Sequence, residues 1–126
     1  MTFVAINAAG GPIGSVSLVE HDLPDRPEFA HLTPWVAGTY VVAEERGQGV
    51  GSALMRHVVD EAHRLGLPEL FLYTSAARVF YERLGWVGLR DDVYEGEQVT
   101  LMTTRVGRSP RAPSDRLDRD PPAGVA

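Results

Sequence analysis

The sequence predicts an α/β fold with a mixed, mostly antiparallel sheet flanked by helices, and three observations support this. Two strand-like runs, 3–7 and 13–20, flank the turn sequence AAGGP, which is typical of an antiparallel hairpin. A strand–helix–strand unit spans 35–74, and a second hairpin follows at 86–105. The element order is therefore β-β-β-α-β-α-β-β, with one crossover inside an otherwise antiparallel arrangement.

The central elements follow from apolar spacing. The runs 35–43 and 69–74 are rich in β-branched and aromatic residues and predict two central strands. Between them, a helix over 49–65 is predicted by apolar residues at helical spacing, with Gly66 after its last turn: Val50, Leu54, Val58, Ala62 and Leu65.

Two shorter segments complete the domain. A short helix is expected over 76–84, closed by Gly85. The segment 21–34 contains three prolines and several acidic residues. We expect it to form a loop, and its length favours a functional role.

The composition of the chain indicates how many domains it contains and where the folded part ends. The chain has 126 residues, of which 44% are hydrophobic and 23% charged, as in an ordinary single globular domain. After residue 106 the composition changes: 107–126 holds four of the nine prolines and shows no helical or strand periodicity. We therefore expect a folded domain over 1–106 and a disordered Pro/Arg/Asp-rich tail over 107–126.

Charge and cysteine content exclude several functions. The formal net charge is −5 and all twelve basic residues are arginine, which disfavours nucleic acid as a partner. No apolar run is long enough to span a membrane, and the first residues lack the pattern of a secretory signal, so we expect a cytoplasmic protein. The absence of cysteine excludes disulfides, and the four scattered histidines do not have metal-ligand spacing.

A glycine-rich loop joins the first central strand to the long helix. The sequence RGQGVGS over 46–52 places glycines at 47, 49 and 51. Glycines allow left-handed backbone and close approach of peptide N–H groups, and a helix N-terminus favours anions. The loop suits a phosphate or pyrophosphate, although a glycine turn without a ligand is the better explanation of an isolated G-x-G-x-G. Without lysine it cannot be a Walker loop, and its spacing is not that of the dinucleotide fingerprint.

Two motifs together resemble a known family. Arg46, Gly49 and Gly51 match the R/Q-x-x-G-x-G/A signature of acetyl-CoA binding, and the segment ARVFYERLGW over 77–86 looks like A-x-x-F-Y-x-x-x-G-F/W. The sequence thereby resembles the GNAT N-acetyltransferase superfamily from residue 3 to about residue 106. It departs from the family in lacking the usual first strand and N-terminal helices. We expect either an unusually open acceptor cleft, a cleft that a second subunit closes in a homodimer, or a start codon that has been placed too late.

The resemblance implies a site for acetyl-CoA as co-substrate, with no metal. It implies that the pyrophosphate lies on the loop, the pantetheine arm lies along the first central strand, and the two central strands part near the thioester. The implied cofactor-binding residues are Arg46, Gly47, Gln48, Gly49, Val50, Gly51 and Ser52 in the loop, Tyr40, Val41 and Val42 in the strand, and Thr74, where the family often has asparagine. A strand N–H, at Val41 or Val42, would support the developing oxyanion.

The catalytic groups follow in part from the same resemblance. Tyr81 is the candidate general acid, because a phenol stays protonated at neutral pH and can donate to a departing thiolate. His21 is the candidate general base, although water could replace it. Glu20 and Asp22 are the candidate substrate-binding residues, with Asp22 as an anchor for an ammonium group.

Three functions remain open from the sequence. The first is an acyl-CoA-dependent N-acyltransferase that moves an acetyl group to a primary amine on a small molecule or peptide. The second is a non-catalytic acyl-CoA-binding or regulatory module with an incomplete acceptor site. The third is an interaction scaffold without a ligand. Tyr81 and the complete glycine loop favour the first of these.

Overall fold

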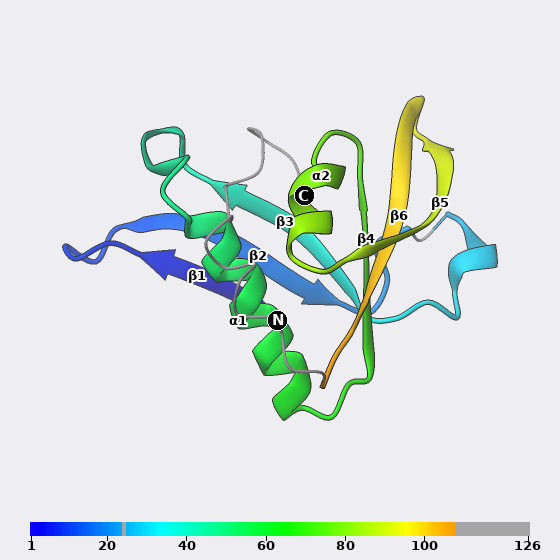
Figure 1. Cartoon of the computed structure of the whole chain (residues 1–126), viewed down its shortest axis with the longest axis horizontal. Coiled ribbons are helices and arrows are strands. Elements are labelled where there is room, and N and C mark those ends of the chain that lie inside the picture. The colour runs from blue at the N-terminus through cyan, green and yellow to red at the C-terminus, as the bar shows by residue number, and fades with distance from the viewer. Residues whose placement is uncertain (24, 108–126) are drawn as a thin grey trace.

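A computed structural model describes residues 1–23 and 25–107 of the chain. Its single sheet has the strand order β1-β2-β3-β4-β6-β5 (Figure 1). The expected element order and the mixed α/β architecture are confirmed. The strands are β1 (Thr2–Ile6), β2 (Pro12–Val19), β3 (Trp35–Val41), β4 (Glu69–Thr74), β5 (Val87–Tyr94) and β6 (Glu97–Arg105); the helices are α1 (Val50–Arg64) and α2 (Arg78–Arg83).

The first three strands form an antiparallel meander. The β1–β2 hairpin closes through Asn7, whose side chain accepts hydrogen bonds from the N–H groups of Ala9 and Gly11 at 3.0 and 2.9 Å. The register between β2 and β3 shifts between Ser17↔Ala37 and Ser15↔Tyr40, so β3 has one extra residue there. Gly38 lies in this bulge with φ of 65°, a conformation that glycine adopts without steric cost.

The parallel pairing of β3 with β4 is very short. Among the described residues, Trp35↔Phe71 is the only residue pair that joins these two strands. Beyond it, β3 continues beside β2 while β4 pairs with β6 as far as Thr74↔Thr100. Figure 1 shows the two strands diverging from this point toward their carboxyl ends. The expected parting of the two central strands is therefore present.

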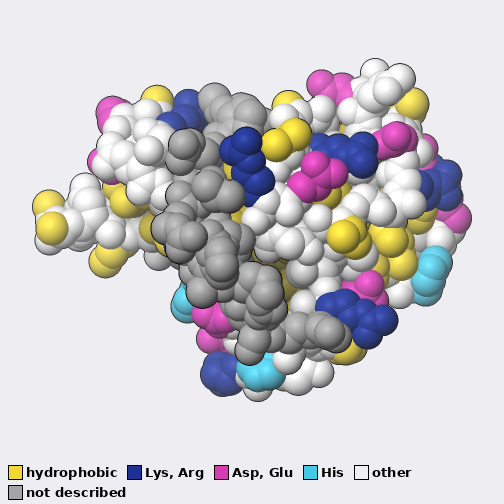
Figure 2. All heavy atoms as spheres, viewed as in Figure 1, with side chains coloured by type: hydrophobic (Ala, Val, Ile, Leu, Met, Phe, Trp, Pro, Cys, Tyr) yellow, Lys and Arg dark blue, Asp and Glu magenta, His cyan; other side chains and the backbone are white. Residues whose placement is uncertain are grey.

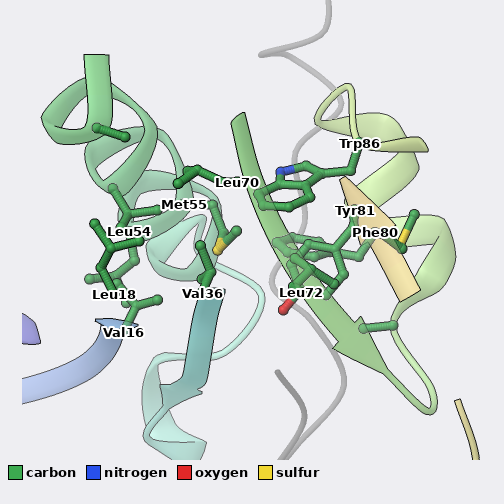
Figure 3. Packing of buried hydrophobic residues seen from close by; sticks show 14 residues of the cluster. Val16, Leu18, Val36, Leu54, Met55, Leu70, Leu72, Phe80, Tyr81 and Trp86 are labelled. Carbon is green, nitrogen blue, oxygen red and sulfur yellow. The ribbon is translucent and has the colours of Figure 1, made fainter. Parts of the chain in front are cut away.

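Helix α1 and the short helix α2 pack on one face of the sheet. Their apolar side chains meet those of β2, β3 and β4 in the larger core cluster (Figure 3). Gly66 follows α1 with φ of 77°, as expected for the residue after a helix end. The first turn of α1 lies close to β2, because a Cβ at Gly14 would lie 3.2 Å from Val50 Cγ1 and 3.1 Å from Leu54 Cδ1.

The segment between β2 and β3 covers the opposite face. It contains a 3-10 turn, Pro27–Phe29, and its Phe29 and Leu23 are buried in a second cluster with Trp35, Phe71, Val99 and Leu101. Arg26 fastens the segment to β5: its guanidinium donates to Asp92 Oδ2 at 2.9 Å and to the Val93 carbonyl at 3.1 Å. The expected loop over 21–34 is thus packed onto the sheet rather than projecting from it.

Several expected boundaries need correction. The strand expected over 35–43 ends at Val41, and 43–45 forms a 3-10 turn instead. The helix expected over 76–84 is shorter, Arg78–Arg83, because the Thr74 hydroxyl bonds the Ala77 N–H and holds the preceding turn open. The tail expected over 107–126 lies, apart from Gly107, outside the described residues. No helix in the described part of the chain is long and apolar enough to cross a membrane.

We predict that Gly14→Ala lowers the free energy of unfolding by about 1–3 kcal/mol, because the added methyl overpacks the junction of α1 with the sheet. The new Cβ would lie only 2.9 Å from the Tyr40 carbonyl oxygen, so backbone must move. Urea denaturation measures the change. Gly88→Ala is the matched control, since a Cβ there meets nothing closer than 3.5 Å. Equal stability of the two variants would contradict the close approach.

Candidate active site

The glycine loop presents the N-terminus of α1. Gly47 and Gly49 have φ values of 81° and 85°, so the left-handed backbone expected there is confirmed. Gly49 is the N-cap residue and no side chain caps it. A Cβ at either glycine would meet nothing within 4 Å, so the need for glycine is conformational rather than spatial. The arrangement directs the positive end of the helix dipole at the loop.

The remaining loop residues have more varied positions. Val50 begins α1, and Gly51 and Ser52 are buried in its first turn, so the third glycine is helical. Gln48 Nε2 donates to the Glu44 carbonyl at 3.4 Å. Arg46 turns back along β3: its Nε donates to the Val41 carbonyl at 2.9 Å, and its guanidinium lies 5.5 Å from the centre of the Tyr40 ring. The cation expected for the pyrophosphate is therefore tied to the end of β3.

The end of β3 distinguishes the two expected oxyanion donors. The Val42 N–H donates to the Ile13 carbonyl at 2.9 Å, on the side of β2. Hydrogen bonding alternates along an antiparallel strand, so Tyr40, opposite Ser15, also pairs toward β2, while the N–H of Val41 points toward β4. Of the two candidates, only Val41 directs its N–H to the side on which β3 and β4 part.

Tyr81 lies at the centre of the larger core. It is completely buried on α2, with its ring centre 5.0 Å from that of Phe80 and 6.2 Å from that of Trp86. Figure 3 shows its side chain pointing from α2 toward Leu72 of β4. Its hydroxyl has no hydrogen-bond partner among the described residues. Burial raises the pKa of the phenol to about 12, so it stays protonated at any physiological pH.

Thr39 is a polar core residue that the sequence reasoning missed. It is buried in β3 next to the bulge, and its hydroxyl contacts Met55 Sδ of α1 at 3.7 Å. The same hydroxyl lies close enough to Tyr81 to oppose the rise of the phenol pKa, without reaching hydrogen-bond geometry with it. A threonine after glycine in an apolar strand was the available signal, but the bulge that turns it inward is invisible in sequence.

Thr74 closes β4 and its hydroxyl already has a structural partner. The side chain is buried, and its oxygen accepts a hydrogen bond from the Ala77 N–H at 3.0 Å. This contact fixes the turn that leads into α2 and so orients Tyr81. The hydroxyl keeps its own hydrogen as a donor.

The three candidates at the start of the covering segment differ in environment. Glu20 and His21 are exposed, and the Glu20 carbonyl accepts from the Thr33 hydroxyl at 2.7 Å. Asp22 is half-buried, and desolvation by burial raises the pKa of its carboxyl to about 6. The next residue, Leu23, is buried in the second cluster, and Tyr73 and Tyr94 pack against that cluster. Burial is the main cause that raises the pKa of both phenols, and the charge of Asp22 adds to it. These two tyrosines had not been singled out from the sequence.

The structure thus gathers the candidates into three groups along the parting of β3 and β4. The glycine loop and the end of β3 form the first. Tyr81, Thr39 and Thr74 form the second, in the core on the α1 side of the sheet. Asp22, Tyr73 and Tyr94 form the third, on the face covered by 21–34. On the face shown in Figure 2, arginine side chains are scattered among acidic ones.

Comparison with known proteins gives one family and several related folds. A family model described as an acetyltransferase (GNAT) domain matches residues 1–88. Among solved structures, an aminoglycoside 6′-N-acetyltransferase in complex with coenzyme A aligns with a TM-score of 0.66 at 13% identity, over 87% of this chain and 74% of that one. An IAA acetyltransferase from Bacillus cereus aligns with a TM-score of 0.63 at 22% identity, over 83% and 77%.

A nourseothricin acetyltransferase aligns with a TM-score of 0.65 at 28% identity, over 82% of this chain and 64% of that one. At these sequence identities, the similarity to solved structures is evidence for the fold. The family model carries the assignment, because it covers the meander, the glycine loop, α1 and the Tyr81 helix in one match. The chain belongs to the GNAT acetyltransferase family.

Proposed function

We propose that this protein is an acyl-CoA-dependent N-acyltransferase that moves an acetyl group from acetyl-CoA to a primary amine by direct attack. The single observation that carries the proposal is the Tyr81 hydroxyl, which is completely buried and has no partner among the described residues. A buried polar group without a partner costs about 1–3 kcal/mol, so its retention favours a function. The acceptor is a small-molecule or peptide amine.

The residues present fit acetyl-CoA as the donor. Gly47, Gly49 and Val50 offer backbone N–H groups at the amino end of α1, which suits the pyrophosphate. The parting of β3 and β4 suits an extended arm that lies beside β3, as an added strand would. Acetyl-CoA supplies an activated acyl group, and the rest of the chemistry falls to protein side chains.

Two residues act on the reaction itself. Tyr81 donates its phenolic proton to the sulfur as the C–S bond breaks and the C–N bond forms. Because its pKa is raised to about 12, Tyr81 acts as an acid and never as a resident phenolate. Val41 donates its N–H to the carbonyl oxygen as negative charge develops there. Thr74 positions the phenol through the turn before α2, and the Thr39 hydroxyl of β3 lies near it.

We predict that Gly49→Ala weakens CoA binding at least tenfold, because a φ of 85° strains any side chain and shifts the N–H groups of the first turn. Isothermal titration with CoA measures the affinity. Gly66→Ala is the matched control, with a φ of 77° at the other end of the same helix. Both variants should lose similar stability, and only Gly49→Ala should lose affinity. Equal CoA affinity in the two variants would argue against the loop as the binding site.

We predict that Tyr81→Phe lowers kcat by about 100-fold or more with little change in KM for acetyl-CoA, since general acids contribute about 10²–10⁴-fold. The same change should raise the free energy of unfolding by about 1 kcal/mol or leave it unchanged, because it removes an unpartnered buried hydroxyl. Thiol release and thermal melting measure the two effects.

A loss of activity accompanied by a loss of stability would indicate a structural role for Tyr81. CoA binding without turnover on any amine would instead favour the non-catalytic acyl-CoA-binding module. Absence of CoA binding altogether would leave only the scaffold.

A further inference from the structure

We propose that Asp22, Tyr73 and Tyr94 form the acceptor subsite, that it takes a primary ammonium group attached to an apolar or aromatic carbon skeleton, and that Asp22 accepts the ammonium proton. The inference rests on the proposed function, since it names the acceptor side of the same reaction. It also replaces His21 with its neighbour as the general base.

Asp22 is a carboxylate that meets no counter-ion in the described part of the chain. It is half-buried, and within the described residues it takes part in no hydrogen bond and no ion pair. The cation on the same segment, Arg26, is directed elsewhere, to Glu28 at 2.8 Å and to Asp92 at 2.9 Å. A carboxylate removed from water in this way is stabilised by a cationic ligand, and an ammonium group supplies that charge.

The surroundings of Asp22 suit the rest of such a ligand. The Tyr73 ring centre lies 5.5 Å from that of Tyr94 and 6.5 Å from that of Trp35, in edge-to-face arrangements. The wall therefore presents aromatic rings beside a negative charge, a combination that holds cations and flat apolar groups. Burial is the largest cause of the raised pKa of both tyrosines, and the surrounding charges add to it: Glu95 raises the pKa of both, Asp25 raises that of Tyr94, and Arg26 lowers that of Tyr94.

The aromatic wall, formed by Tyr73, Tyr94 and Trp35, lies where β3 and β4 begin to part. Trp35 and Phe71 make the single residue pair between the two strands, and Tyr73 is the next residue of β4 on the same face. That face carries the second core cluster, whereas Tyr81 belongs to the cluster on the α1 side. An acyl group held between the strands would meet the amine from one face and the proton donor from the other.

Asp22 and Tyr81 together account for the protons that the reaction transfers. The ammonium nitrogen transfers one proton to an Asp22 carboxylate oxygen, and its freed electron pair forms the C–N bond as the C–S bond breaks. The nitrogen then loses a second proton, which replaces the one that Tyr81 gives to the sulfur. The products are the acetamide, the CoA thiol and one proton carried away from Asp22. His21, which is exposed on the same segment, is not needed.

Benzylamine is the probe, with benzyl alcohol as its uncharged analogue, and binding is followed by NMR titration with and without saturating CoA. We expect the wild-type chain to bind benzylamine at least tenfold more tightly than benzyl alcohol. Asp22→Asn should abolish this preference and leave CoA affinity unchanged. Asp60→Asn is the control, an exposed carboxylate on α1. Equal benzylamine affinity in the wild-type chain and Asp22→Asn overturns the subsite.

Measurements of acetyl-transfer activity distinguish a failure of the acceptor subsite from a failure of the proposed function. In the wild-type chain kcat/KM for benzylamine should fall below pH of about 6, where Asp22 becomes protonated, and Asp22→Asn should lose this acidic limb. If His21→Asn abolishes the fall of kcat/KM at acidic pH and Asp22→Asn retains it, Asp22 is not the general base. Binding that depends on Asp22 without acetyl transfer upholds the subsite and counts against the transferase.

A stability measurement tests the unpaired carboxylate without any ligand. The pKa of Asp22 in the folded chain, about 6, lies above its ordinary value of 3.8, so the folded state binds the proton more tightly. Stability is therefore full below pH 3.8 and declines as the pH rises through about 6. Asp22→Asn should raise Tm by roughly 2–5 °C at pH 8, and the gain should vanish near pH 4. A lower Tm at pH 8 would show that Asp22 has a stabilising partner.

Discussion

The site depends on one constraint, the early parting of β3 and β4. In the register of Trp35↔Phe71, a parallel pair that continued would extend to Gly38 opposite Thr74, the last residue of β4, and would close the gap between the two strands. The bulge at Gly38 prevents this, because an extra residue bends its strand and increases the local twist. Beyond the bulge each strand keeps its other neighbour, β2 for β3 and β6 for β4. The two halves of the sheet are thus each fully paired while the edge between them is open.

Different elements cover the two faces of the sheet on either side of this parting. On one face α1 supplies its amino terminus and α2 supplies Tyr81, and both helices are held by the larger core. On the other face no α-helix of the described residues packs, and the segment 21–34 is held by Phe29 and by the Arg26 contacts with β5. The position of Asp22 therefore depends on an ion pair four residues away. Because Asp92 is itself only slightly exposed, this contact is less screened by salt than a pair on the open surface.

Local sequence signals predicted most of the fold and the groups that lie on regular elements. Glycines at 47, 49, 66 and 85 mark places where the chain needs positive φ, and all four have it. The strand 69–74 was predicted at its observed limits, since its neighbours Pro68 and Ser75 interrupt the apolar run. Thr39 could not be found, because a bulge is a property of the register between two strands. Asp22 and His21 could not be ranked, because only the packing of their segment decides which side chain loses its water.

Two energetic costs coincide at this parting. Within residues 1–23 and 25–107, the buried Tyr81 hydroxyl has no partner and the half-buried Asp22 carboxylate has no counter-ion, and the two groups lie on opposite faces of the same two strands. Either group could be replaced by an uncharged or apolar one of similar shape with no loss of packing, so neither is explained by folding alone. Each lacks a different kind of partner: the phenol lacks an acceptor for its proton, and the carboxylate lacks a cation. A sulfur anion and an ammonium group are the two species that an acyl transfer from a thioester to an amine brings together, and each satisfies one of these needs.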